Sequence, residues 1–327
     1  MHKIQRESIL NPNFLSFFEI DGQEPVIKNN FFYFSQNKFP VINGIPRFTS
    51  DASYVANNFG KLREKHATLQ LDSKNETSDR RKTILGRTKW PSHFFKNKAI
   101  LECGCGAGPD TEILLSLGAR VIAVDMAGVD IAKKNIGIND NVQFIQASIL
   151  DLPLKMKSFD IVFCHRVLQH TPNPAETLSY LLKFVKENGA VFIHSYSPGL
   201  KKINPWKYAL RPITTRMSPE ILYKLIKLYA KPAYRVTNLL NRKKFGRTFV
   251  KKFIPFRNHK LHPYLSEKND DFLIEYGIHD TFDSLSPMFD NPIEPDTMEQ
   301  IAKNNLKQPY EIIKTPTITL LRTIITH

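Results

Sequence analysis

One stretch of the sequence constrains the fold more than any other: an apolar run that enters a turn with alternating glycines. The run 100–103 leads into this turn, and Pro109 then opens a predicted helix, where its missing N–H costs nothing. The glycines are Gly104, Gly106 and Gly108. A second apolar run, 119–124, ends at the carboxylate Asp125. Because glycines allow close approach of the backbone to a ligand, the pattern predicts a nucleoside-type cofactor site at the carboxyl end of a parallel sheet.

The glycine spacing argues against a nicotinamide dinucleotide site. That fingerprint requires G-x-G-x-x-G, and Pro109 stands where its third glycine belongs. With Glu102 before the turn and Asp125 after it, the sequence instead resembles the first two motifs of the class I S-adenosylmethionine (SAM)-dependent methyltransferases. The match continues through 144–153 and 159–172, so that four motifs follow in the family's order within 99–195.

The resemblance implies SAM as the cofactor and gives each matching residue a role. Glu102 suits the ammonium of the methionine tail, directly or through water, and Asp125 suits the ribose diol. Met126 would pack on the adenine. The family often has an acid at the position of Ser148, which can still accept a hydrogen bond. The expected cofactor-binding residues are Glu102, Gly104, Cys105, Gly106, Gly108, Asp125, Met126, Ser148, Ile149 and His165.

Strands and helices are predicted to alternate along the middle of the chain. The predicted strands are 99–102, 120–124, 142–146, 160–164 and 190–195, and the predicted helices are 110–116, 129–135 and 175–187, the last ended by Asn188-Gly189. Such alternation implies a parallel sheet. A helix near 295–302 and a strand pair, 310–315 and 317–324, follow later. We therefore expect an α/β, Rossmann-like, doubly wound seven-stranded sheet whose last strand is reversed, as in the family.

Three further regions surround this predicted domain, which comprises 99–196 and 294–327. Residues 1–50 should form a small β module with a hairpin turn at Asn43-Gly44. Its segment 39–48 resembles the edge of a degenerate zinc ribbon that lacks the cysteine pairs, so we expect aromatic packing and no metal. Residues 51–98, helical over 54–71, should be a connector that folds over the cofactor. There, cofactor contact from Asp72 or Arg81 is an alternative to a solvated helix end.

The charge of the chain is concentrated in one place. The whole chain carries +15, yet 197–260 holds 17 Lys or Arg and one acid, so the remainder is close to neutral. This segment lies in a predicted mainly helical insertion, 197–293, on the substrate side of the fold. It mixes cations with aromatic residues. Three functions remain open, in order of preference: binding an anionic membrane surface, covering a phosphorylated, glycan-linked or nucleotide-linked substrate, and binding RNA.

Composition indicates the compartment. The three cysteines, Cys103, Cys105 and Cys164, fit neither a disulfide framework nor a zinc site. No apolar run reaches about 18 residues, and the start of the chain lacks a secretory apolar region. We expect a cytoplasmic protein, with peripheral attachment to the inner face of the membrane as an alternative.

The candidate catalytic residues are His165, His170 and Asp280. Both histidines should lie near the end of the fourth strand, where a base could remove a proton from the methyl acceptor; for His170, loop ordering is the alternative. In the insertion, segment 275–287 groups two carboxylates, a histidine and hydroxyls. We expect His279, Asp280 and Asp283 to bind the substrate, with helix capping as the alternative. No metal site is expected.

These observations favour a SAM-dependent methyltransferase acting on an anionic small-molecule, lipid-linked or glycan-linked acceptor. Two alternatives remain: an RNA methyltransferase and a non-catalytic SAM-binding regulator.

Overall fold

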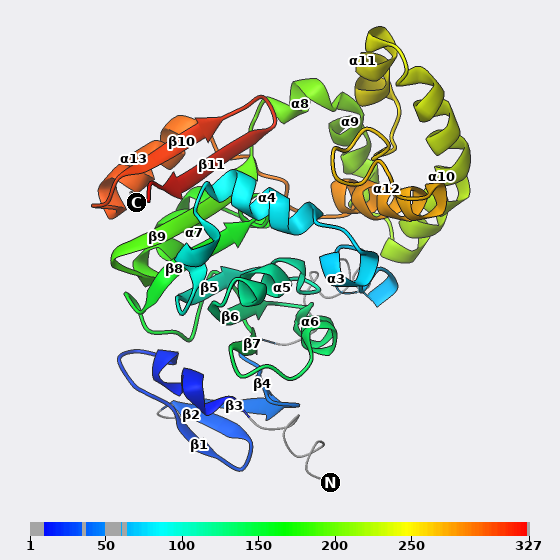
Figure 1. The fold of residues 1–327 in the computed structure, drawn as a ribbon. Coiled ribbons are helices and arrows are strands. Elements are labelled where there is room, and N and C mark those ends of the chain that lie inside the picture. The colour runs from blue at the N-terminus through cyan, green and yellow to red at the C-terminus, as the bar shows by residue number, and fades with distance from the viewer. Residues whose placement is uncertain (1–9, 35–36, 50–59, 61–63, 326–327) are drawn as a thin grey trace.

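The computed structural model describes residues 10–34, 37–49, 60 and 64–325. Its centre is a seven-stranded sheet in the order β10-β11-β9-β8-β5-β6-β7 (Figure 1). The strands are β5 (Ala99–Cys103), β6 (Arg120–Asp125), β7 (Val142–Gln146), β8 (Phe159–His165), β9 (Val185–Tyr196), β10 (Tyr310–Lys314) and β11 (Ile318–Thr323). Strands β5 to β9 pair in parallel, whereas β11 runs antiparallel to both β9 and β10. The predicted sheet, including its reversed strand, is confirmed.

Helices cover both faces of this sheet, because its central strands are apolar on both sides. One face packs against α4 (Asp79–Thr88), α5 (Pro109–Ser116) and α6 (Val129–Ile136), with Ile84, Ile113 and Val129 in the contact. The other packs against α7 (Pro174–Leu181) and α13 (Pro295–Asn305). The carboxyl ends of β5, β6, β8 and β9 therefore meet at one edge, next to the start of α5.

The predicted helix over 175–187 is too long. Helix α7 ends at Leu181, a 3-10 turn η5 (Leu182–Phe184) follows, and Val185 pairs with Phe159 as the start of β9. The pairing then shifts, so that Ile161 faces Ala190. Asn188, with φ of 62°, takes the left-handed conformation inside this irregularity. The Asn-Gly signal therefore marks a strand bulge and not the end of a helix.

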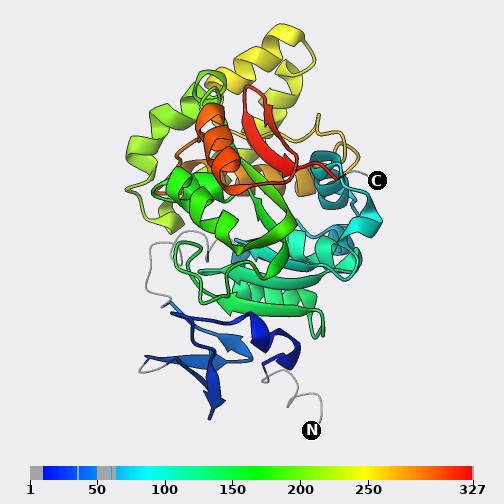
Figure 2. The ribbon, with the colours of Figure 1, turned by 90° about the vertical axis from the view of Figure 1, so that its left-hand side faces the viewer.

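The N-terminal residues form a four-stranded antiparallel sheet after a 3-10 turn, η1 (Pro12–Phe17). Its strands are β1 (Val26–Lys28), β2 (Phe31–Phe34), β3 (Asn37–Ile42) and β4 (Ile45–Pro46). Asn43 and Gly44, both with positive φ, make the tight turn between β3 and β4. Rings of Phe18, Phe32, Phe34, Phe39 and Phe48 contact one another in its core. Figure 2 shows this module beside the β7 edge of the main sheet, where Arg47 bridges to Gln146. Its likeness to a zinc ribbon stays a prediction.

The connector consists of short helices over the start of α5. Helix α3 (Asp72–Asn75) precedes α4, and a 3-10 turn η3 (Ser92–Phe95) leads into β5. The buried Asp72 carboxylate accepts hydrogen bonds from the backbone N–H groups of Arg80 and Arg81, so it orders the start of α4. The Arg81 side chain donates to Ser116. Of the predicted helix over 54–71, residues 54–59 and 61–63 lie outside the described residues.

The insertion is mainly helical, with a core of its own (Figure 1, right). Its helices are α8 (Leu200–Ile203), α9 (Pro205–Thr214), α10 (Pro219–Leu240), α11 (Lys244–Phe253) and α12 (Asp270–Leu285). Trp206, Leu222, Tyr234, Leu273 and Phe282 meet in that core. We refer to 197–293 as the cap. No helix in the described part of the chain is both long and apolar enough to cross a bilayer.

Candidate functional site

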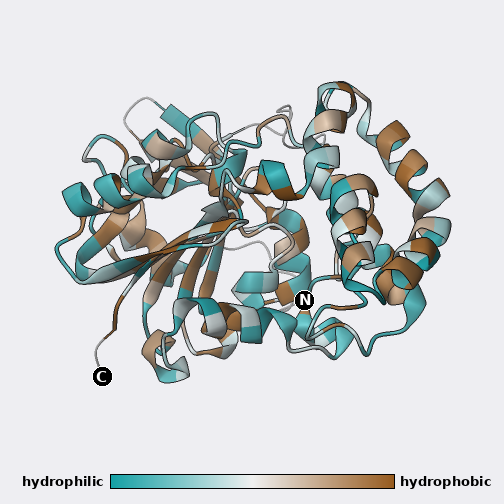
Figure 3. Cartoon of the chain, turned by 90° about the horizontal axis from the view of Figure 1, so that it is seen from above, coloured by the Kyte–Doolittle hydropathy of each residue, from teal (hydrophilic) through white to brown (hydrophobic). Residues whose placement is uncertain are grey.

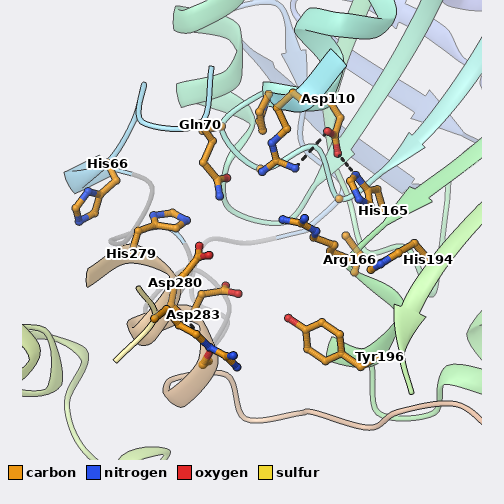
Figure 4. A pocket seen from close by; sticks show the side chains of 18 of the residues that line it. His66, Gln70, Asp110, His165, Arg166, His194, Tyr196, His279, Asp280 and Asp283 are labelled. Atoms are coloured by element: carbon orange, nitrogen blue, oxygen red, sulfur yellow. Dashed lines mark hydrogen bonds and ion pairs between the residues drawn. The ribbon is translucent and has the colours of Figure 1, made fainter. Parts of the chain in front are cut away.

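A pocket of about 550 Å³ lies between the carboxyl edge of the sheet and the cap (Figure 4). The sheet side contributes the glycine-rich loop, the residues after β8 and the end of β9. The connector and α12 close the opposite side. The residues that line it include Gly104, Cys105, Gly106, Asp110, His165, Arg166, Val167, His194, His66, Arg80, Arg87, Arg257, His259, His279, Asp280 and Asp283.

The glycine-rich loop is tightly packed and needs its glycines. Gly104, Gly106 and Gly108 have φ of 79°, 60° and 90°, in the left-handed region that side chains disfavour. A Cβ on Gly104 would lie 2.4 Å from a methyl of Val167. The backbone N–H groups of Gly104 and Cys105 both donate to the carbonyl of Val124 on β6. The loop is thereby fixed close to the sheet edge, with its backbone along the pocket.

Asp125, at the end of β6, joins this loop to the next. Its Oδ2 accepts from the N–H of Gly106, and its Oδ1 accepts from those of Ala127 and Gly128, each at 2.9 Å. Its predicted partner is a ribose, and the structure adds a second role, in which the carboxylate orders two loops at once. These three donors fix the position of the carboxylate at the end of β6.

The residues predicted for the adenine end lie beside Asp125 and outside the lining of this pocket. Met126 follows Asp125, and its carbonyl accepts from the Gln146 amide at the end of β7. Ser148 and Ile149 follow β7, the strand next to β6; the Ser148 hydroxyl accepts from the N–H of Leu150, and Ile149 is 8% exposed. The structure thus brings these residues together at the β6–β7 end of the site.

Glu102 is buried, and few neighbouring groups would stabilise its negative charge. Its Oε2 accepts from the Thr111 hydroxyl at 2.6 Å. Burial raises its pKa to about 8, and the nearby carboxylates of Asp110 and Asp125 add to that rise. A cation bound next to Glu102 would favour the ionised form.

A buried chain of polar side chains crosses the floor of the pocket. Asp110 lies 3.4 Å from an Arg80 nitrogen and 2.8 Å from His165 Nδ1, and Arg87 lies 2.7 Å from His165 Nε2. Because Arg87 can only donate, Nε2 must be the acceptor, and the proton sits on Nδ1 and points at Asp110. Burial lowers the pKa of His165 to about 3. Burial alone would raise the pKa of Asp110, but His165 and Arg80 outweigh it and hold it below the usual range. His165 is therefore a neutral ring held on both sides.

Sequence reasoning missed most of this chain. Asp110 directly follows Pro109 in the glycine motif, and that position was the available signal. Arg80 and Arg87 come from α4, and His194 comes from β9 with its ring centroid 5.1 Å from that of His165. Nothing in their spacing links these residues to the glycine loop.

The cap side of the pocket carries histidines and carboxylates. His279, Asp280 and Asp283 all come from α12, and Figure 4 shows Asp280 and Asp283 facing the pocket. Asp280 Oδ2 lies 3.0 Å from Nε2 of His259, which sequence reasoning did not select. Burial alone would raise the pKa of Asp280, but His259 and His279 outweigh it and hold the pKa below the usual range. Burial lowers the pKa of His66, beside His279, to about 4.

His170 lies apart from the pocket lining. It ends the 3-10 turn η4 (Leu168–His170), and its Nδ1 lies 3.0 Å from the carbonyl of Phe289, so it donates to the segment after α12. This contact ties the loop after β8 to the cap. In the described part of the chain, no three His, Cys, Asp or Glu side chains are placed to hold a metal ion.

Comparison with known proteins identifies a family whose model matches the part of the chain that carries the glycine-rich loop. The "Methyltransferase domain" family matches residues 101–193, which run from β5 to β9. Two curated relatives are the mitochondrial ubiquinone biosynthesis O-methyltransferase of Schizosaccharomyces pombe and the malonyl-[acyl-carrier protein] O-methyltransferase of Halalkalibacterium halodurans. They are 35% and 34% identical, over 32% and 31% of this chain and 39% and 40% of their own. Residues 101–193 therefore form a methyltransferase domain of the class I, SAM-dependent kind.

The chain spans less than half the length of these two relatives. Solved structures that resemble the chain include a SAM-dependent methyltransferase from Mesorhizobium loti, at 19% identity, a TM-score of 0.33, and coverage of 38% of this chain and 56% of that one. Another is Haemonchus contortus phosphoethanolamine N-methyltransferase 1 in complex with phosphoethanolamine and S-adenosylhomocysteine. Its sequence identity is 22%, its TM-score is 0.33, and the match covers 43% of this chain and 32% of that one.

The residues at the site fit the cofactor of this methyltransferase domain. A Cβ on Gly128 would lie 2.2 Å from the Gly106 carbonyl, so the two loops that meet at Asp125 leave no room for larger residues. Glu102 offers a buried carboxylate for an ammonium group, and Asp125 offers a second one for a diol. The glycine-rich loop exposes backbone between them. These are the three kinds of group that the tail and ribose of SAM require.

Proposed function

We propose that the protein transfers the methyl group of SAM to an anionic acceptor, either a small molecule or one carried on a lipid or a glycan. One observation carries this proposal: a single pocket is lined by the glycine-rich loop on one side and by the cap on the other. When bound, SAM supplies an electrophilic methyl group on a sulfonium centre. An acceptor seated under the cap would meet that methyl group inside the pocket.

Arg166 is our candidate for holding the anionic group of the acceptor. It follows His165 directly after β8 and has a left-handed backbone, with φ of 63°, which a non-glycine residue adopts at a cost. Its side chain reaches into the pocket toward the side where Asp280 and Asp283 lie (Figure 4). No described carboxylate lies within 4.0 Å of its guanidinium nitrogens, the limit for an ion pair. A carboxylate or phosphate of the acceptor would supply the missing partner in a bidentate contact.

Arg257 provides a second cation for the same group. It enters from the cap, where its guanidinium lies 5.2 Å from the Trp206 ring centroid and donates to the Ser284 hydroxyl at 3.3 Å. Two arginines from different elements favour a multiply charged group such as a phosphate. The cap carboxylates Asp280 and Asp283 would then accept hydrogen bonds from the hydroxyl or amine that is methylated.

The base is better assigned to His259 than to the other candidates. Arg87 occupies the lone pair of His165, which leaves that ring a positioning role. Asp280 is a weak base because its pKa is held low, but it lies within 3.0 Å of His259 and can orient that imidazole. We propose that the Asp280–His259 pair removes the acceptor proton as the methyl group is transferred. His170 keeps a loop-ordering role through Phe289.

The experiment combines purified protein, SAM with a labelled methyl group and fractionated cell extract. Labelling of an anionic fraction is expected, and Arg166→Gln should lower kcat/KM for that acceptor on the order of a hundredfold while SAM binding stays within about twofold. Arg120→Gln is the control, because this half-buried arginine contacts the N-terminal module and lies outside the pocket lining.

Two results would contradict the proposal. SAM binding by calorimetry without labelling of any fraction would favour the non-catalytic regulator. Labelling of RNA, with salt-sensitive retention, would favour the RNA methyltransferase.

A further inference from the structure

Large hydrophobic side chains are exposed along one side of the cap. Nine large hydrophobic side chains of α9 to α11 are exposed to solvent, and Phe245 and Leu228 are 83% and 80% exposed. Figure 3 shows hydrophobic residues along these helices, at the end of the molecule away from the sheet. We call this set the apolar stripe; it comprises Ile213, Ile221, Leu225, Leu228, Val236, Leu239, Phe245, Phe249 and Phe253.

Helix α10 has two apolar faces, although the cap needs only one. Leu222, Ile226, Ala230 and Tyr234 recur every fourth residue and are buried in the core of the cap. Ile221, Leu225 and Leu228 follow the same helical period, shifted to the opposite face, and remain exposed. A second apolar face of this kind costs solubility unless something covers it, and contiguous exposed apolar patches mark interaction sites.

Cations flank the apolar stripe, and no carboxylate in the described part of the chain pairs with them. Ten Lys or Arg side chains of α10, α11 and the turn between them are exposed: Lys224, Lys227, Lys231, Arg235, Arg242, Lys243, Lys244, Arg247, Lys251 and Lys252. Glu220 is the one acid between 213 and 253. None of the ten forms an ion pair with a carboxylate of the described residues. A partner that covers this surface must therefore be anionic as well as apolar.

We propose that the apolar stripe docks the protein on the surface of an anionic lipid bilayer. An interfacial helix of this composition buries its apolar side chains at the boundary between headgroups and acyl chains, while the flanking cations contact anionic headgroups. Each cation near such a surface strengthens binding by roughly fivefold. Nucleic acid would match the cations but would leave Leu228 and Leu239 in water, and a protein partner would need a matching density of acids.

Docking also has a consequence for the pocket, and this step rests on the proposed function. Helix α12 packs on α10 in the core of the cap and supplies His279, Asp280 and Asp283 to the pocket. Packed helices lie about 8–10 Å apart. The pocket would then sit one helix layer from the membrane, within reach of an acceptor carried on a lipid headgroup.

The test is flotation of the full chain with vesicles of phosphatidylcholine alone and vesicles of equal parts phosphatidylcholine and phosphatidylglycerol. We expect binding to the mixed vesicles only. The double substitution Phe245→Ser with Phe253→Ser should weaken that binding on the order of tenfold. Substitution of Lys243, Lys244, Lys251 and Lys252 by Gln should weaken it on the order of a hundredfold, and added salt should do the same to the parent protein.

The matched control is Ile138→Ser with Met156→Ser, which removes two exposed hydrophobic side chains, 47% and 49% exposed, from outside the cap. It should leave vesicle binding unchanged. Absence of vesicle binding by a protein that still binds SAM would overturn docking and leave the proposed function intact.

Three other outcomes would also overturn docking. They are concentration-dependent dimers that Phe245→Ser dissociates, capture of RNA that the serine variants retain, and equal binding to neutral vesicles. Vesicle binding without methyl transfer would overturn the proposed function alone.

Discussion

The methyltransferase domain and the cap, which face each other across the pocket, differ in how many of their charged side chains have partners. In the methyltransferase domain, two of the buried carboxylates at the site are held by partners: Asp110 lies next to Arg80 and His165, and Asp125 accepts from three backbone N–H groups. In the cap, one buried ion pair, Lys207 with Asp290 at 2.9 Å, holds α9 to the end of the insertion. Most of the remaining cap cations point into solvent.

This difference separates two uses of charge. Charges with partners inside the molecule fix its geometry, and their removal is expected to cost stability. Charges without partners cost little to remove, so their accumulation on one surface is better explained by an external ligand. The basic net charge of the chain thus points to what the cap binds and says little about how the cap folds.

The largest expected effect separates two lysines of the cap. Lys207→Ala should lower the free energy of unfolding by about 3–5 kcal/mol, because it leaves the Asp290 carboxylate, 1% exposed, buried without its cation. Lys244→Ala, at an exposed site on α11, should change it by less than about 0.5 kcal/mol. Urea unfolding of both variants measures the difference. Similar values for the two lysines would remove the distinction between structural and surface charge.

On the domain side, Asp125→Ala should lower the affinity for SAM at least about a hundredfold and the free energy of unfolding by about 3 kcal/mol. It removes the predicted ribose contact and leaves the N–H groups of Gly106, Ala127 and Gly128 without their acceptor. Calorimetry with SAM and urea unfolding measure the two effects. The control is Asp130→Ala, whose exposed pair with Arg47 should contribute less than about 1 kcal/mol. Equal losses of SAM affinity and of unfolding free energy in both variants would contradict the role proposed for Asp125.

The same contrast explains what the sequence could predict. The sheet was predictable because strands such as 142–146 are short apolar runs between turn residues, and because the glycine loop fixes which strand ends carry the ligand. Glu102 and Gly104 adjoin the glycine-rich loop, and Asp125 follows after one helix and one strand, so their spacing in the sequence indicates that they belong to one site. The predicted helix end at Glu187 shows the limit: α7 ends at Leu181, and an Asn-Gly pair is as compatible with a strand bulge as with a helix end.

The cap side of the pocket was predictable only in part. Asp280 and Asp283 share one helix with His279, so a local cluster indicated them. His259 reaches Asp280 from a separate loop, and Arg166 was passed over because an arginine after a strand has no distinctive spacing. Contacts of this kind depend on how α12 packs against its neighbours, which no local pattern in the sequence encodes.

The pH dependence of stability tests whether the pKa of Glu102 is raised in the folded protein. Its pKa is near 4.5 in the unfolded chain and is raised to about 8 in the folded one, mainly by burial. The folded state therefore holds the proton more tightly, and the parent protein should lose up to about 1.4 kcal/mol of stability per pH unit between these two values. Glu102→Gln carries no such proton, so its stability relative to the parent should rise by about 2 kcal/mol from pH 6 to pH 7.5.

Urea unfolding at the two pH values checks this, together with SAM affinity, which Glu102→Gln should lower. The control is Glu112→Gln at both pH values, because Glu112 is only half buried, on the same helix as Thr111. A stability difference between Glu102→Gln and the parent that does not change with pH would contradict the raised pKa.

The smallest effect compares two glycines with almost the same backbone. Gly22 and Gly104 have φ of 75° and 79°, so alanine should strain both by roughly 1 kcal/mol. A Cβ on Gly22 meets nothing within 4 Å, whereas one on Gly104 would collide with the stiff Val167 side chain in the pocket wall. Gly104→Ala should therefore cost about 1–2 kcal/mol more than Gly22→Ala in urea unfolding. It should also lower SAM affinity about tenfold, since either the loop or Val167 must move into the pocket. Equal costs and unchanged SAM affinity would mean that the loop after β5 tolerates a side chain, and the close approach of its backbone to the ligand would lose its support.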